Sequence, residues 1–152
     1  AMALFLVQHG RSLPKEIDPD QGLSPEGIAE TEHTARLSQR LGLSIDGILH
    51  SGKTRARLTA EIMAAALTPR SGFRESSGLN PLDDVAPWSS LKPDSSLMLV
   101  GHLPFMERLA SLLVTGSPEQ PVIAFQNSGI VCLNRGELSP NWVIRWALVP
   151  RL

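Results

Sequence analysis

The chain has 152 residues, of which 42% are hydrophobic and 19% charged, and its formal net charge at pH 7 is −1. These values suit one globular domain over residues 1–152, and they give no reason to expect a nucleic acid or a membrane surface as a partner. The single cysteine excludes an internal disulfide, and no apolar run approaches the roughly 20 residues that span a bilayer. We therefore expect a cytoplasmic protein, in which Ala1 before Met2 is a cloning remnant.

The first element is an apolar run over residues 4–7 that stops abruptly at Gln8, His9, Gly10 and Arg11. An apolar run without polar alternation predicts a strand that is buried on both faces, as in a parallel sheet. Ligands of open α/β sheets bind beyond the carboxyl ends of such strands, which is where His9 falls. Gly10 permits a sharp turn there, and Arg11 places a permanent cation near the imidazole.

A polar loop over residues 13–23 precedes the first predicted helix. Residues 24–26, Ser-Pro-Glu, have the pattern of an N-cap, a proline in the first helical position and a carboxylate facing the positive end of the helix dipole. We expect an apolar stripe on this helix, formed by Ile28, Leu37 and Leu41 with Ala29 and Ala35, and we expect Gly42 to end it.

A second buried strand is predicted over residues 45–50, followed by a polar turn and a helix that continues through Leu67. Lys53, Arg55 and Arg57 crowd the start of this helix, where the helix dipole disfavours cations. This placement indicates an anion, whose charge backbone N–H groups and basic side chains would share. The alternative is a helix start that is simply solvated.

Prolines and glycines interrupt residues 68–96, which predict only a short strand around Phe73 and a helical turn or two over residues 82–91. Asp83 and Asp84 are the acidic candidates for a general acid in this segment. The alternative role for both is at an exposed helix start, where carboxylates are favoured by the helix dipole.

The opening pattern returns at residues 97–100, an apolar run followed by Gly101 and His102. Leu-Pro follows, and a helix is predicted over residues 105–115. Two histidines that each lie just beyond a buried strand indicate a shared site at one edge of the sheet.

Three more strands are predicted, over residues 122–125, 129–134 and 142–149. We expect a hairpin through residues 135–137 to join the last two. Apolar and polar residues alternate along the last strand, which is typical of a half-buried edge strand, and Ser128 is expected in a turn.

These motifs resemble the signature of the histidine phosphatase superfamily, in particular its short phosphohistidine phosphatase (SixA-like) branch. The first strand of that family ends in Arg-His-Gly or Arg-His-Ala, and here Gln8 stands in place of the arginine. Residues 51–59 are similar to the second motif, Ser-Pro-x-x-Arg-Ala-x-x-Thr, with Gly52 in place of proline and Thr59 matching the threonine. His102, with Leu-Pro after it, is similar to the third motif.

Strand and helix patterns alternate through residue 115, which predicts an α/β fold. The resemblance implies a three-layer α/β/α sandwich with a mostly parallel sheet, the phosphoglycerate-mutase-like fold. It also implies that His9 is the nucleophile, that Arg55 and His102 hold the phosphoryl oxygens, and that neither a metal nor another cofactor takes part. Gln8 and Arg11 complete the expected phosphate-binding set.

Gln8 is the main departure from the family pattern. A glutamine amide donates a hydrogen bond without a charge, so its bond to phosphate is expected to be weaker than that of arginine by about 1–2 kcal/mol. This difference corresponds to about a five- to thirtyfold loss in rate.

The short chain predicts an open site, which suits a phosphoryl group carried on a protein surface. Imidazole is a better leaving group than an alkoxide, so a phosphohistidine substrate needs less proton donation. We therefore expect phosphohistidine on a partner protein as the substrate, with a small phosphoester as an alternative. Two other classes stay open: a binding module for phosphoproteins or phosphometabolites, because Gln8 weakens the site, and a zinc site formed by His9, His50 and His102.

Overall fold

The computed structural model describes residues 3–91, 95–135 and 140–151, with a six-stranded sheet as the middle layer. The strands are β1 (Ala3–Gln8), β2 (Gly47–His50), β3 (Phe73–Glu75), β4 (Leu97–Gly101), β5 (Ile130–Arg135) and β6 (Trp142–Leu148). The helices are α1 (Pro25–Arg40), α2 (Thr54–Leu67), α3 (Ala86–Ser89) and α4 (Phe105–Thr115). None of the helices in the described ranges is both long and apolar enough to cross a bilayer.

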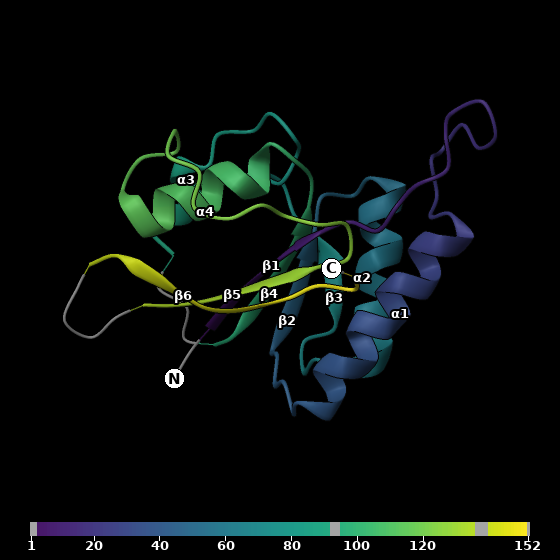
Figure 1. Ribbon diagram of the computed structural model, residues 1–152, viewed down its shortest axis with the longest axis horizontal. Coiled ribbons are helices and arrows are strands. Elements are labelled where there is room, and N and C mark those ends of the chain that lie inside the picture. The colour runs from purple at the N-terminus through teal and green to yellow at the C-terminus, as the bar shows by residue number, and fades with distance from the viewer. Residues whose placement is uncertain (1–2, 92–94, 136–139, 152) are drawn as a thin grey trace.

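The sheet is parallel over most of its width. Its strand order is β3-β2-β4-β1-β5-β6, in which β3, β2, β4 and β1 run parallel, β5 runs antiparallel to β1, and β6 runs antiparallel to β5. Helices α1 and α2 cover one face of the sheet, and α3 and α4 cover the other (Figure 1). The prediction of a three-layer sandwich with a mostly parallel sheet is confirmed.

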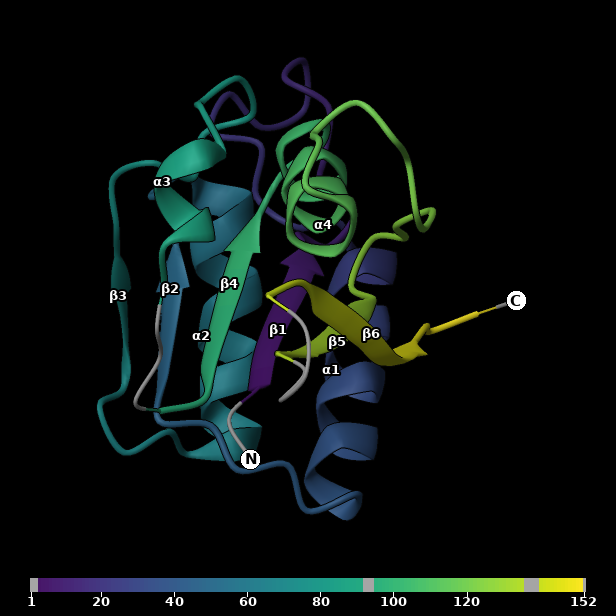
Figure 2. The same ribbon diagram turned by 90° about the vertical axis from the view of Figure 1, so that its left-hand side faces the viewer.

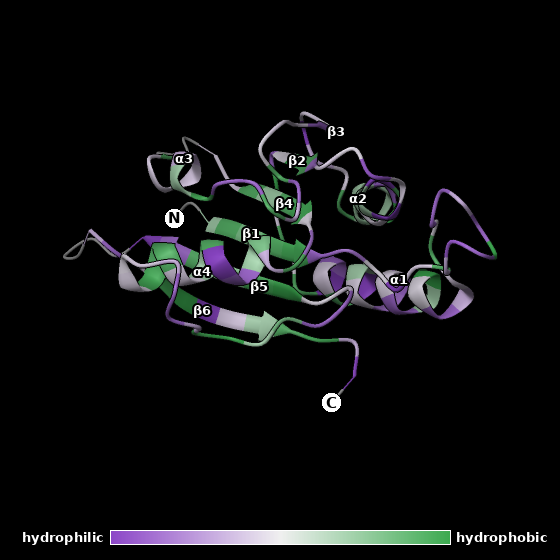
Figure 3. Cartoon of the chain, turned by 90° about the horizontal axis from the view of Figure 1, so that it is seen from above, coloured by the Kyte–Doolittle hydropathy of each residue, from purple (hydrophilic) through white to green (hydrophobic). Residues whose placement is uncertain are grey.

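Strand β1 is buried on both faces because a core lies on each side of the sheet. Phe5 and Val7 pack in the cluster that includes α1 and α2, while Leu4 and Leu6 pack in the cluster beneath α4. Figure 3 shows β1 and β5 as hydrophobic strands at the centre of the molecule. Each such side chain stabilises the fold by about 1.5–3 kcal/mol when fully buried. The absence of polar alternation in the opening run follows from this two-sided burial.

Strands β2, β4 and β1 end at the same edge of the sheet. They are adjacent and parallel, and the registers pair Gln8 with Gly101 and His50 with Val100 (Figure 2). The N–H of His9 donates to the Gly101 carbonyl at 2.9 Å, so the pairing continues one residue beyond β1. The residues that follow these strands are therefore brought to one edge.

Helix α1 begins as predicted, since the Ser24 side chain accepts a hydrogen bond from the N–H of Gly27 at 3.0 Å. The predicted apolar stripe is only partly right: Ala35 is buried and Leu37 is half-buried, but Ala29 is exposed, Ile28 is 41% exposed and Leu41 is 64% exposed. The buried face consists of small residues and residues with hydroxyl groups, namely Gly27, Thr31, Thr34, Ala35 and Ser38. Small side chains let α1 approach the loop after β1 closely. The spacing of large apolar residues in the sequence does not predict such a contact.

Residues 122–125 do not form the predicted strand, because residues 121–126 are irregular. Val122, Ile123 and Phe125 instead pack, partly buried, against the cluster beneath α4. These side chains are apolar because they pack against the core. A short apolar run in the sequence does not distinguish an irregular segment that packs in this way from a strand.

Strands β5 and β6 pair antiparallel, and burial alternates along β6, which lies at the edge of the sheet as predicted. The hairpin predicted through residues 135–137 falls largely outside the described residues, because 136–139 are not among them.

Candidate active site

Three segments meet beyond the carboxyl ends of β1, β4 and β2. His9 follows β1, His102 follows β4, and Arg55 lies in the first turn of α2, which follows β2. The centroids of the His9 and His102 rings are 5.0 Å apart. Arg55 lies close enough to lower the pKa of both imidazoles. The structure therefore brings these three residues together.

The proton on the His9 ring is placed by a backbone carbonyl. Nδ1 of His9 lies 2.6 Å from the carbonyl oxygen of Gly10. A carbonyl oxygen can only accept a hydrogen bond, so Nδ1 carries the proton and donates it. In neutral imidazole the other nitrogen, Nε2, then keeps a free lone pair.

Both imidazoles are held in the neutral form. Burial lowers the pKa of His9 below its ordinary value of 6.5, and the Arg55 cation lowers it further, while the hydrogen bond to Gly10 opposes the shift. Burial lowers the pKa of His102 to about 3, and the neighbouring His9, Arg55 and Lys53 contribute to this shift. Neutral imidazole with a free lone pair is a competent nucleophile.

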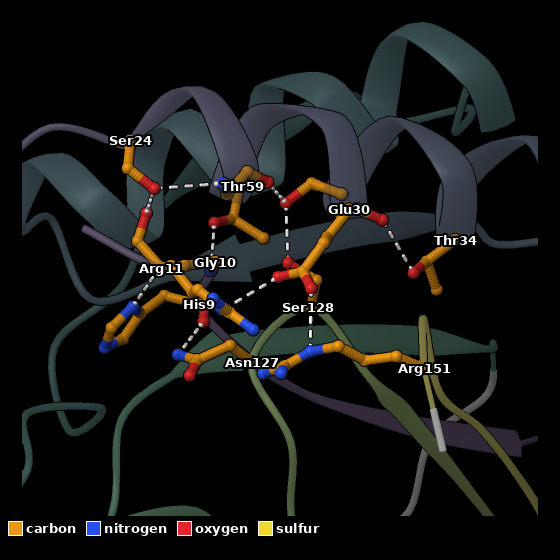
Figure 4. Close-up of polar contacts among 12 residues, drawn as sticks. His9, Gly10, Arg11, Ser24, Glu30, Thr34, Thr59, Asn127, Ser128 and Arg151 are labelled. Carbon is orange, nitrogen blue, oxygen red and sulfur yellow. Dashed lines mark hydrogen bonds and ion pairs between the residues drawn. The ribbon is translucent and has the colours of Figure 1, made fainter. Parts of the chain in front are cut away.

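The loop that carries His9 is fixed from two sides. The N–H of Gly10 donates to Thr59 Oγ1 at 2.9 Å, and the same hydroxyl donates to the Arg55 carbonyl at 2.8 Å. On the other side, Asn127 Nδ2 donates to the His9 carbonyl at 2.8 Å (Figure 4). These bonds tie the loop to α2 and to the segment before β5.

Glycine is required at two positions because the loop and α1 approach each other closely. A Cβ at Gly10 would lie 2.8 Å from Thr31 Oγ1 and 3.0 Å from Ser128 Oγ. A Cβ at Gly27 would overlap the carbonyl of Arg11. A side chain at either position would push α1 away from the loop that carries His9.

Arg11 is engaged by an acidic residue of α1. Its Nε lies 3.2 Å from Glu30 Oε1, and Arg151 Nε lies 2.8 Å from Glu30 Oε2 (Figure 4). The Glu30 side chain is only 16% exposed, so its charge requires these cations. The prediction that Arg11 binds phosphate did not include its ion pair with Glu30.

The side chain of Gln8 lies at the end of β1. Its Oε1 is buried and has no hydrogen-bond partner among the described residues. Its backbone carbonyl accepts from the N–H of Ser128 at 2.9 Å. An unpaired buried acceptor costs about 1–3 kcal/mol, so a polar side chain at this position destabilises the fold.

Asp83 and Asp84 make the contacts of turn residues. Asp83 accepts from the N–H of Asn80 at 2.8 Å, and Asp84 accepts from the N–H of Ala86 at 3.0 Å. Both line a surface cavity of about 460 Å³ together with Pro104, at the start of α4. Both contacts belong to the turn before α3, whose own first turn holds no acidic residue.

The zinc alternative lacks a set of ligands. Within the described ranges, no three His, Cys, Asp or Glu side chains are grouped so that they could hold a metal ion. Nδ1 of His50 accepts from the N–H of Gly52 at 3.1 Å, and its ring packs against Phe73 with the centroids 6.1 Å apart. His50 thus takes part in contacts other than those of the His9–His102 pair.

Two polar residues next to the histidines had no predicted role. Ser51 Oγ lies 2.6 Å from His102 Nε2. The position of Ser51 as the first residue of the second motif was the feature of the sequence that could have indicated a role. Asn127 is 118 residues from His9, and its contact has no local signal. Ser128 takes the turn position that was predicted, with φ at 66°.

Comparison with known proteins shows likeness over almost the whole chain, although no family model matches it. An uncharacterized protein of Picosynechococcus sp. is 33% identical over 146 residues, which cover 89% of this chain and 86% of that protein. The structure of the protein histidine phosphatase SixA with tungstate is 27% identical, with a TM-score of 0.83 over 98% of this chain and 97% of that one. A phosphoserine phosphatase of Entamoeba histolytica with phosphoserine shares the fold, with a TM-score of 0.72 and 15% identity over 99% of this chain and 98% of that one.

Proposed function

Since the chain belongs to the histidine phosphatase superfamily, in its SixA-like branch, we propose that it is a phosphatase that forms a covalent phosphohistidine on His9. The observation that carries the proposal is the hydrogen bond from His9 Nδ1 to the Gly10 carbonyl, which leaves the lone pair of Nε2 free beside His102. A half-buried neutral imidazole with this proton arrangement is ready to attack phosphorus.

The reaction has two displacements at phosphorus. In the first, His9 Nε2 attacks, and the bond from phosphorus to the leaving group breaks with its electron pair on the leaving atom. In the second, water attacks the same phosphorus, the bond to Nε2 breaks, and inorganic phosphate is released. The His9 ring gains positive character while it carries the phosphoryl group, and its Nδ1–H bond to Gly10 stabilises that charge.

The neighbouring groups suit the charge on the phosphoryl oxygens. Phosphoryl transfer is accelerated mainly by positioning and by donors aimed at the equatorial oxygens. We assign these contacts to Arg55, to His102 and to the amide of Gln8. The first turn of α2, Thr54 to Arg57, holds no acidic residue, so its N–H groups and cations favour an anion.

For the substrate we propose phosphohistidine on a partner protein. The leaving imidazole needs little help from an acid, and Asp83 and Asp84 are occupied as turn acceptors. A small phosphoester is the second candidate, for which either carboxylate would have to serve as a general acid.

The nucleophile can be tested with a radiolabelled phosphohistidine peptide and rapid quenching. The wild-type protein should acquire acid-labile label, and His9→Ala should acquire none. His33→Ala is the matched control, because His33 is an exposed histidine on α1, outside the site. Equal labelling of the wild type and His9→Ala would refute the assignment.

Turnover separates the phosphatase from a binding module. Inorganic phosphate should be released over time in the presence of EDTA, which would stop a reaction that depends on a metal. Phosphate binding without release would favour the binding module. A preference of about tenfold or more in kcat/KM for a small phosphoester, equivalent to about 1.4 kcal/mol, would overturn the substrate but not the phosphatase activity.

A further inference from the structure

Ser51 and His102 form a buried pair at the ends of β2 and β4. Ser51 Oγ lies 2.6 Å from His102 Nε2, and the two residues are 9% and 2% exposed. They are 51 residues apart in the chain, and the pairing of β2 with β4 brings them together. The pair lies next to His9, whose ring centroid is 5.0 Å from that of His102.

The hydrogen of the Ser51 hydroxyl can be placed from its contacts. The backbone N–H of Lys53 donates to Ser51 Oγ at 3.3 Å, which uses one lone pair of the oxygen. If His102 Nε2 also donated, the hydroxyl would accept twice, and its own hydrogen would need another acceptor. If the hydroxyl donates to Nε2, both atoms are satisfied by the contacts present. The geometry therefore favours Ser51 as the donor.

This bond determines which nitrogen of His102 carries the proton. Burial lowers the pKa of His102 to about 3, so the neutral ring has a single N–H. With Nε2 accepting from Ser51, that proton is on Nδ1. Nδ1 is buried, and among the described residues it has no hydrogen-bond partner. A buried donor without an acceptor is rare in folded proteins and indicates a missing partner.

We propose that Ser51 is a positioning residue, which holds His102 as the tautomer with the proton on Nδ1 so that Nδ1 donates to a phosphoryl oxygen at His9. Without Ser51, the proton could move to Nε2, and Nδ1 would present a lone pair to the negatively charged oxygen. The identity of the acceptor rests on the proposed function. The tautomer rests on the contacts of Ser51 alone.

The tautomer can be measured in the wild-type protein without ligand. Heteronuclear NMR of isotopically labelled protein distinguishes a protonated ring nitrogen from one with a lone pair, and loss of the signals in His102→Asn assigns them. At neutral pH, Nδ1 of His102 should be protonated and Nε2 should not. The opposite assignment would overturn the proposal without any measurement of activity.

Substitution of Ser51 tests what the tautomer does. Ser51→Ala should give His102 a mixture of tautomers and weaken the binding of inorganic phosphate by about tenfold, since donors aimed at a bound oxyanion have large effects. Ser51→Thr keeps the hydroxyl and should restore both properties. Ser38→Ala is the matched control, because this buried hydroxyl donates to the Thr34 carbonyl at 2.9 Å and lies outside the site.

The outcomes separate this proposal from the proposed function. If Ser51→Ala keeps the wild-type tautomer and phosphate affinity, Ser51 is not a positioning residue, whatever the activity of the protein. If the protein releases no phosphate from any donor but the tautomer depends on Ser51, the proposed function fails while the role of Ser51 in positioning His102 holds.

Discussion

Thr59 connects the loop that carries His9 to the helix that carries Arg55, and Thr59→Val tests this connection. The side chain is fully buried, and its hydroxyl accepts from the N–H of Gly10 at 2.9 Å and donates to the Arg55 carbonyl at 2.8 Å. Valine keeps the size and the β-branch and replaces the hydroxyl with a methyl group. The change therefore removes two hydrogen bonds while it leaves the packing volume almost unaltered.

The larger part of the lost stability comes from the N–H of Gly10. Its buried N–H is left without an acceptor, which costs about 1–3 kcal/mol. The Arg55 carbonyl loses less, because a carbonyl inside a helix also accepts from the N–H one turn later. We expect the free energy of unfolding to fall by about 2 kcal/mol, or about 4–8 °C in Tm for a chain of this size. We also expect kcat to fall by at least about tenfold, since small displacements of reacting groups are costly.

Denaturant unfolding and steady-state kinetics measure both effects. Thr34→Val is the matched control, because Thr34 is an equally buried helical threonine whose hydroxyl donates to the Glu30 carbonyl at 2.9 Å. It should lose less stability, because the substitution leaves no N–H without an acceptor. Equal stability losses in the two variants would refute the account of the Gly10 bond, and an unchanged kcat in Thr59→Val would refute its link to the nucleophile.

Four further outcomes are expected. Only neutral His9 is nucleophilic and burial lowers its pKa, so the acid limb of a pH–rate profile of kcat/KM should have its midpoint below pH 6.5; a midpoint at or above this value would contradict a lowered pKa of His9. As pH falls below 6.5, the unfolded chain protonates His102 while the folded protein, whose His102 has a pKa of about 3, does not. The free energy of unfolding should therefore fall between pH 6.5 and about 3, more steeply than in His102→Asn, and equal pH dependence in the two proteins would argue against a lowered pKa of His102. Calorimetry should show that Gln8→Arg tightens inorganic phosphate binding by about five- to thirtyfold, and an unchanged Kd would place residue 8 outside the phosphate contacts. Arg55→Ala should weaken that binding by about tenfold or more, and Arg11→Ala by less than about threefold, because Glu30 holds Arg11; a large effect at Arg11 would show that it leaves Glu30 for the ligand.

The positions of His9 and His102 could be predicted because the decisive information is local. Each histidine follows a run of apolar residues without polar alternation, which is typical of a strand between two layers. Parallel strands in one sheet bring their carboxyl ends to the same edge, so a shared edge followed from the fold class, while the contact of the two rings needed β1 and β4 to be neighbours. The start of α1 was equally local, since the bond from Gly27 to Ser24 spans a single turn.

The partners of the site residues were decided by the tertiary structure. Arg11 and Arg151 both meet Glu30, and Ser51 meets His102, only once strands and helices from distant parts of the chain are packed. The sequence alone determined the ends of β1, β2 and β4, the N-cap of α1 and the residue types at the edge of the sheet, because these depend on neighbours within a few residues. Contacts across the sheet decide which cation is neutralised by a carboxylate and which is left for a ligand. They also decide which nitrogen of His102 bears the proton, and no local sequence pattern encodes these contacts.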